Sequence, residues 1–150
     1  MIKSAHKKFF KGFTLIELLI VIAILGILAA AVLVAINPGK RTRQARDAQR
    51  KNDVGALATE LQGYYTSPGS GCYPATLQVL VDDEYLKQMP KDPTTNAEYT
   101  YDLGTPVDCT AGAEEAALSA TLQEPITASY IWCWESSDGK AEEQATCAAP

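Results

Sequence analysis

The sequence predicts an α+β protein in which a long N-terminal helix, first transmembrane and then amphipathic, packs on a small antiparallel sheet. Three observations support this fold class: residues 13–36 form an apolar run, residues 54–65 place apolar side chains at helical spacing, and residues 98–135 contain three alternating segments. Helical spacing predicts one buried helix face, and alternation predicts strands with one packed face. The 150 residues leave room for one small domain after the apolar run.

The apolar run extends from Phe13 to Ile36 and contains only two polar residues, Thr14 and Glu17. A helix over this run would be about 36 Å long, which exceeds a hydrocarbon thickness of about 30 Å. An acid at the centre of such a helix costs about 2.5–3.5 kcal/mol on insertion scales. Because the run contains no base, we expect Glu17 to be a functional carboxylate whose partner lies outside its own segment.

The residues around the start of the run form a specific motif. A basic head ends in Lys11-Gly12, and Phe13-Thr14-Leu15-Ile16-Glu17 follows directly. This motif before a long apolar helix resembles the processing signal of type IV prepilins and type II secretion pseudopilins. The resemblance implies that a prepilin peptidase cuts after Gly12 and N-methylates Phe13. The new Phe13 ammonium of one subunit and Glu17 of its neighbour could then neutralise each other by assembling.

Two other interpretations of the run remain open. A plain signal anchor needs a basic head and an apolar helix, but it has no use for Gly12 or Glu17. A secretory signal peptide could be cut near Ala29-Ala30-Ala31, which would remove Glu17. The acid within the run and its continuation through Val32 and Leu33 argue against that cut.

The resemblance divides the chain into four parts. They are a leader at 1–12, a transmembrane and filament-core helix at 13–36, an amphipathic helix half at 37–66 and a globular domain at 67–150. Asn37-Pro38-Gly39 predicts a kink or melted turn between the helix halves. The second half has one apolar face, formed by Val54, Leu57, Ala58, Leu61, Tyr64 and Tyr65.

The globular domain begins with a predicted helical turn at 76–81 and an irregular segment around Pro90 and Pro93. Strands are predicted at 98–103, 116–123 and 128–135, and a hairpin turn at 137–140. Tyr130, Trp132 and Trp134 share one strand face. We expect the Cys72 loop or the C-terminal tail to cover this aromatic row, with an exposed recognition stripe as the alternative.

Charge is distributed unevenly around the formal net value of −5. From Asn52 onward the chain contains sixteen acids and only three bases, Lys87, Lys91 and Lys140. We therefore do not expect the globular domain as a whole to bind nucleic acid. Residues 40–51 hold six bases and one acid. We expect this basic stretch to contact lipid head groups or acids of neighbouring subunits.

The four cysteines, Cys72, Cys109, Cys133 and Cys147, lack the spacing of a zinc site. An even number in an exported domain predicts two disulfides. Three pairings are open, and we favour Cys72–Cys109 with Cys133–Cys147 because the latter pair flanks the predicted hairpin. Free buried cysteines are the alternative.

The sequence shows no catalytic constellation. The only histidine, His6, falls in the leader, and no phosphate-binding glycine loop is present, so we predict that the chain is not an enzyme. We predict no cofactor. The candidate calcium ligands lack EF-hand spacing, and a solvated acidic surface is the preferred interpretation; they are Asp82, Asp83, Glu84, Asp92, Asp102 and Asp108.

A second resemblance concerns the segment from Tyr85 to Tyr101, with Pro90-Lys91-Asp92-Pro93 at its centre. It resembles the entry to the sheet of G-type major pseudopilins and related pilins. In that family an aromatic residue or glycine usually follows the Asp-Pro pair. Thr94-Thr95 stands there in this chain, so the calcium geometry of the family is not carried over.

We therefore expect a structural subunit of a type IV pilus that serves adhesion, twitching motility or DNA uptake. The expected partners are other copies of the chain, prepilin peptidase, an inner-membrane assembly platform with its motor, and lipid before assembly. The protein would cross the membrane once and then form an extracellular or periplasmic filament. A type II secretion major pseudopilin is the alternative, and a membrane-anchored or secreted acidic binding domain is the alternative of another class.

Overall fold

The computed structural model describes residues 12–106 and 109–149. The chain forms two units, one up to Pro38 and one from Gly39 onward, and each is described by itself.

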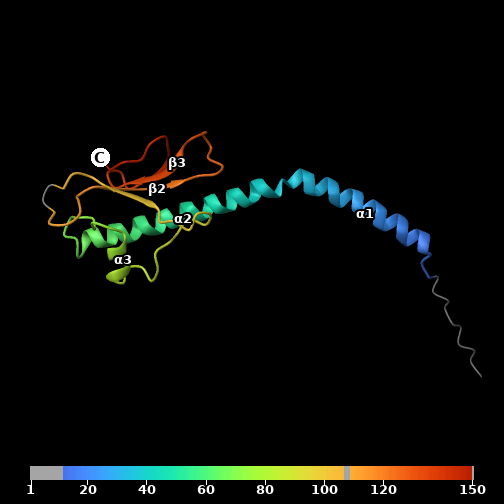
Figure 1. The fold of residues 1–150 in the computed structure, drawn as a ribbon, viewed down its shortest axis with the longest axis horizontal. Helices are drawn as coiled ribbons and strands as arrows, with labels where there is room; N and C mark the ends of the chain where they lie inside the picture. The colour runs from blue at the N-terminus through green and yellow to red at the C-terminus, as the bar shows by residue number, and fades with distance from the viewer. Residues whose placement is uncertain (1–11, 107–108, 150) are drawn as a thin grey trace, which may run out of the picture. The chain divides into compact units, whose positions relative to one another are not determined.

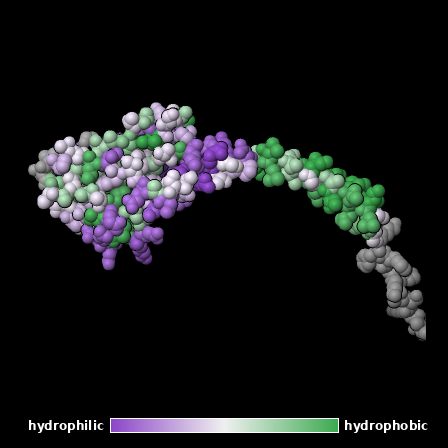
Figure 2. Space-filling model, in the orientation of Figure 1, coloured by the Kyte–Doolittle hydropathy of each residue, from purple (hydrophilic) through white to green (hydrophobic). Residues whose placement is uncertain are grey.

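The described part of the first unit is dominated by helix α1, Leu15–Ile36. Its residues are exposed on every face, and Figure 2 shows the segment as continuously hydrophobic. Among the described residues, this is the one helix long and apolar enough to cross a membrane. Asn37 ends it with a φ of 47°, a left-handed conformation that asparagine tolerates well.

Helix α2, Pro38–Thr66, begins directly after Asn37. The predicted break at 37–39 is therefore confined to one residue. Proline is well suited to the first position of a helix, because the N–H that it lacks would have no helical partner there. The apolar face of α2 is confirmed, with Val54, Leu57 and Leu61 fully buried.

The predicted α+β architecture is confirmed by the second unit, in which α2 packs on a four-stranded antiparallel sheet (Figure 1). The sheet is a meander in the order β1-β2-β3-β4, with a short helix α3 before it. The bounds are α3 Gln78–Asp82, β1 Thr100–Leu103, β2 Ala116–Thr121, β3 Ile131–Glu135 and β4 Ala141–Gln144.

The register brings the apolar residues of the strands together on the face toward α2. Tyr101 lies opposite Leu118, Leu118 opposite Trp134, and Trp134 opposite Ala141. The three predicted strands are confirmed, each shorter than expected. Strand β4 was not predicted, because Ala-Glu-Glu-Gln carries no apolar alternation and becomes a strand by pairing with β3.

The aromatic row of β3 faces α2. Trp134 is 2% exposed and lies edge-on to Tyr73, with ring centroids 6.1 Å apart, while Lys51 of α2 lies 4.3 Å from the centroid of Trp132. Tyr73, directly after Cys72, therefore covers Trp134 as expected, whereas α2 covers Trp132. Covering by the C-terminal tail is wrong, because Cys147 of the tail is bonded to Cys133, which alternates with the tryptophans and lies on the other face.

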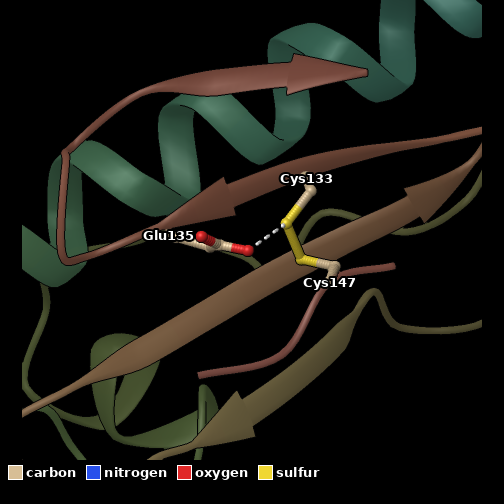
Figure 3. A group of neighbouring side chains, drawn as sticks. All are labelled: Cys133, Glu135 and Cys147. Carbon is tan, nitrogen blue, oxygen red and sulfur yellow. Dashed lines mark hydrogen bonds between the residues drawn. A yellow bond between two sulfur atoms is a disulfide. The ribbon is translucent and has the colours of Figure 1, made fainter. Parts of the chain in front are cut away.

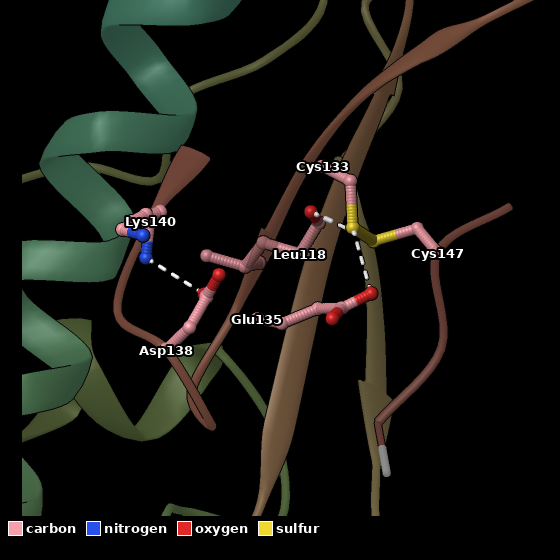
Figure 4. The surroundings of a disulfide bond; sticks show 6 residues. All are labelled: Leu118, Cys133, Glu135, Asp138, Lys140 and Cys147. Carbon is pink, nitrogen blue, oxygen red and sulfur yellow. Dashed lines mark hydrogen bonds between the residues drawn. A yellow bond between two sulfur atoms is a disulfide. The ribbon is translucent and has the colours of Figure 1, made fainter. Parts of the chain in front are cut away.

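Two disulfides, Cys72–Cys109 and Cys133–Cys147, are present, which is the pairing favoured from the sequence. Figure 4 shows the second disulfide beside Leu118 of β2. Its sulfurs and a Glu135 oxygen lie within 4.8 Å of one another (Figure 3). Both sulfurs are consumed by the disulfide, so they are not thiolate ligands, and this cluster does not fit a metal site.

Candidate functional site

The N-terminal motif forms a capping box at the start of α1. The Thr14 backbone N–H and the Thr14 hydroxyl each donate a hydrogen bond of 2.8 Å to Oε2 of Glu17. In return the Glu17 backbone N–H donates to Oγ1 of Thr14 over 3.3 Å. These bonds satisfy backbone donors that have no partner within the helix.

The capping box adds local hydrogen-bond donors to Glu17 that were not expected from the sequence. They come from Thr14, three residues earlier, whereas an opposite charge outside the segment stays a prediction. The Thr-x-x-Glu spacing was present in the sequence, and it is a known capping signal. The charge is still not neutralised, because residues 12–38 contain no lysine or arginine.

Gly12 and Phe13 lie before the helix, in backbone without regular secondary structure. The side chain of Phe13 is 87% exposed, and nothing lies within 4 Å of the position of a Cβ on Gly12. The peptide bond between them is thus accessible in the described structure. An enzyme that needs an extended substrate would not have to unwind α1 to reach it.

In the part of the chain that the structure describes, three of the six bases at 40–51 pair with acids of their own chain. Arg43 contacts Glu124 at 2.6 Å, and Lys51 contacts Glu143 at 2.9 Å. The third base, Arg50, is buried and ion-paired as described below. These three side chains thus find acids in their own chain, because the fold brings distant acids against α2. Contact of the basic stretch with lipid or with neighbouring subunits stays a prediction.

Arg50 is only 3% exposed and joins α2 to two loops. Its Nε donates to Asp92 in the loop before β1, and its Nη1 donates to Asp47 over 2.7 Å. The oxygens of Asp47 also accept the backbone N–H groups of Gln123 and Glu124 at the end of β2. The Arg50 guanidinium, with two further bonds from the N–H groups of Thr94 and Thr95, holds the pKa of Asp92 well below its usual range.

Sequence reasoning did not find this buried network, because charged side chains on a helix are normally solvated. The nearest signal was the lone acid Asp47 among six bases, with Arg50 three residues later on the same side of the helix.

Comparisons with known proteins bear on the N-terminal motif and on the globular domain. The family described as "Prokaryotic N-terminal methylation motif" matches residues 7–33. The chain is also 38% identical over 101 residues to the type II secretion system core protein G of Pseudomonas aeruginosa, an alignment that covers 57% of this chain and 68% of that protein. The chain belongs to the type IV pilin and type II secretion pseudopilin family. No solved structure gives a significant match.

Membership of this family bears on whether the chain is an enzyme and on where it is located before assembly. Members are structural proteins and not enzymes, in agreement with the prediction from the sequence. The exposed apolar helix and the prepilin motif are consistent with anchoring in the inner membrane before assembly.

Calcium is the cofactor that the resemblance to G-type pseudopilins raises, and the loop that contains Asp92 does not fit it. The Asp92 carboxylate accepts four hydrogen bonds, two from Arg50 and one each from the N–H groups of Thr94 and Thr95. Oδ1 accepts three of these bonds and Oδ2 accepts one, so both oxygens are already held by Arg50 or by the loop backbone. The positive charge that a cation would bring is supplied by Arg50. Of the other candidates, Asp82 accepts from Gln78, and Asp108 lies outside the described residues.

Proposed function

We propose that this chain is the major pseudopilin of a type II secretion system. The identity to core protein G carries the proposal, because it extends beyond the N-terminal motif, which pilins and pseudopilins share. In this proposal prepilin peptidase cuts after Gly12, Phe13 becomes the methylated N-terminus, and copies of α1 form the core of a periplasmic filament.

The physical argument for assembly rests on Glu17. Burying α1 against other copies is no gain over lipid by itself, since lipid tails are equally apolar. Close packing at Gly26, Ala29, Ala30 and Ala31 contributes contacts. The capping box uses two of about four acceptor positions of the Glu17 carboxylate, and it holds the charge at the helix start. The ammonium on Phe13 of a neighbouring subunit then neutralises that charge in a medium where lone charges are costly.

A subunit of a surface type IV pilus is the second candidate. It is favoured by two disulfides in one small domain and by Thr94-Thr95 after Asp92-Pro93, where the G-type resemblance calls for an aromatic residue or glycine.

Deletion of the gene, with complementation by the intact chain, separates the two candidates. For a pseudopilin, deletion stops the release of secreted enzymes while surface pili and twitching persist, and the intact chain restores release. Loss of surface pili with normal secretion would reject the pseudopilin assignment and support the pilus. Deletion that leaves both systems intact would reject both candidates.

A further inference from the structure

One large hydrophobic side chain of the globular unit is fully presented to solvent. Ile126, in the loop between β2 and β3, is 91% exposed, and among the described residues from Gly39 onward no other large hydrophobic side chain is classed as exposed. A single exposed aliphatic side chain is common on protein surfaces. What distinguishes Ile126 is how firmly its loop is held.

The β2–β3 loop is held by charged side chains on both sides of Ile126. Asp47 of α2 accepts the N–H groups of Gln123 and Glu124 just before it. The Ile126 N–H itself donates to Oε2 of Glu143 over 2.7 Å, and Oε1 of Glu143 accepts from Lys51. The backbone at Ile126 is thus held by hydrogen bonds, so little loop ordering is needed when this side chain binds.

A pocket lies beside α3, at the opposite end of the same unit. Figure 1 shows α3 next to the last part of α2. The pocket has a volume of about 390 Å³ and is lined by Val81 and Leu86, with Glu84 and Lys87 contributing charge; we call it the α3 pocket. Tyr85, next to Leu86, packs against Tyr64 and Gly63 in the last part of α2. The β2–β3 loop instead contacts Asp47. Asp47 lies sixteen residues before Gly63 on α2, which corresponds to about 24 Å along the helix axis.

The two ends also differ in charge. Arg41 is exposed near the start of α2, on the side of the β2–β3 loop, and Arg43 is also exposed there although it pairs with Glu124. Asp82, Asp83 and Glu84 are exposed beside the α3 pocket. Figure 2 shows hydrophilic surface in both regions. Bases near the start of α2 can therefore face the acids beside the α3 pocket of a second copy.

We propose that Ile126 of one copy inserts into the α3 pocket of the next copy along the filament. A side chain at one end and its pocket at the other make a head-to-tail contact, which generates an open-ended polymer when the rotation does not close a ring. The proposal rests on the proposed filament function and adds a specific contact between globular units. This contact sets the spacing of subunits, while α1 supplies the filament core.

Site-specific photocrosslinking tests the contact in assembled filaments. The probe is benzoylphenylalanine in place of Ile126 of the full chain, with the same probe at Ser137 in the exposed β3–β4 turn as the control. We expect irradiation to give dimers from position 126, with the linked peptide containing Val81 to Lys87, and a different or absent product from position 137. Dimers from position 126 that map elsewhere, or filaments that give no dimer, would overturn the proposal.

A charge substitution provides a second measurement that does not need the probe. Ile126→Asp places an acid against Asp82, Asp83 and Glu84, and we expect it to raise the concentration needed for assembly at least about tenfold, whereas Ile126→Leu and Ser137→Asp leave it near the parent value. An unchanged thermal midpoint of the Ile126→Asp subunit shows that it is folded. Normal assembly of Ile126→Asp contradicts this contact alone. A parent chain that forms no filament contradicts the proposed function as well.

Discussion

Nε of Arg50 lies 2.5 Å from Oδ2 of Asp92, and this ion pair joins α2 to a loop 42 residues further along the chain. Arg50 also binds Asp47 and the hydroxyl of Thr94, so one buried guanidinium holds two carboxylates and a loop. Several properties of the globular unit depend on this arrangement.

Replacing Arg50 should destabilise the globular unit strongly. In Arg50→Met the buried carboxylate of Asp47 and the partly buried carboxylate of Asp92 lose their counter-charge, and removal of one partner of a buried pair typically costs about 3–5 kcal/mol. Denaturant unfolding of the full chain in detergent, with both disulfides intact, measures the loss. The matched control is Arg43→Met, which breaks the more exposed pair with Glu124 and should cost no more than about 1 kcal/mol. Equal losses in the two variants would contradict the assigned role of Arg50.

The same ion pair predicts acid sensitivity. Because Arg50 lowers the pKa of Asp92 in the folded state, the unfolded chain binds a proton more readily at this group. The stabilisation is complete above the unfolded pKa of about 3.9 and is lost as the pH falls below it toward the folded value. Thermal midpoints between pH 7 and pH 2 measure this loss. Asp92→Asn should flatten the curve at its acidic end, and an unaltered curve would show that Asp92 does not contribute.

Calcium should not stabilise the globular unit through the Asp92 loop. Both oxygens of Asp92 accept hydrogen bonds from Arg50, which already supplies the positive charge that a calcium ion would bring. We expect the same thermal midpoint with excess calcium and with a chelator. A bound ion at 100 times its dissociation constant would add about 2.7 kcal/mol. A calcium-dependent rise that disappears in Asp92→Asn would show that the loop binds the metal after all.

Substitutions of Glu17 separate its charge from its role in the capping box. Glu17→Gln keeps an oxygen that can accept from Thr14 but removes the charge, whereas Glu17→Ala removes both. If neutralisation of the Phe13 ammonium drives assembly, neither variant forms filaments, although both insert into the membrane. Filament yield and membrane fractionation of the processed protein give the two readouts. Normal filaments from Glu17→Gln would show that the capping box, rather than the charge, is what assembly requires.

Features that depend on neighbouring residues could be predicted from the sequence. The apolar run of α1, the Gly12-Phe13 motif, the buried face of α2 and three of the four strands each follow from local composition or spacing. Periodicity in the sequence indicates which face of a helix or strand is buried, and each such signal is contained in a short stretch of the chain. The same local information failed for β4, whose polar residues become a strand only beside β3.

The sequence by itself determined a membrane-compatible helix that carries one carboxylate at its start, followed by an amphipathic helix and strands with an apolar face. Only the tertiary structure decided that Arg50 reaches Asp92, that Glu143 holds the N–H of Ile126, and that the tryptophans of β3 face α2. These contacts join residues that are distant in the chain, and a charged side chain looks the same in sequence whether it is solvated or buried. Their partners become known only once the sheet has packed against the helix.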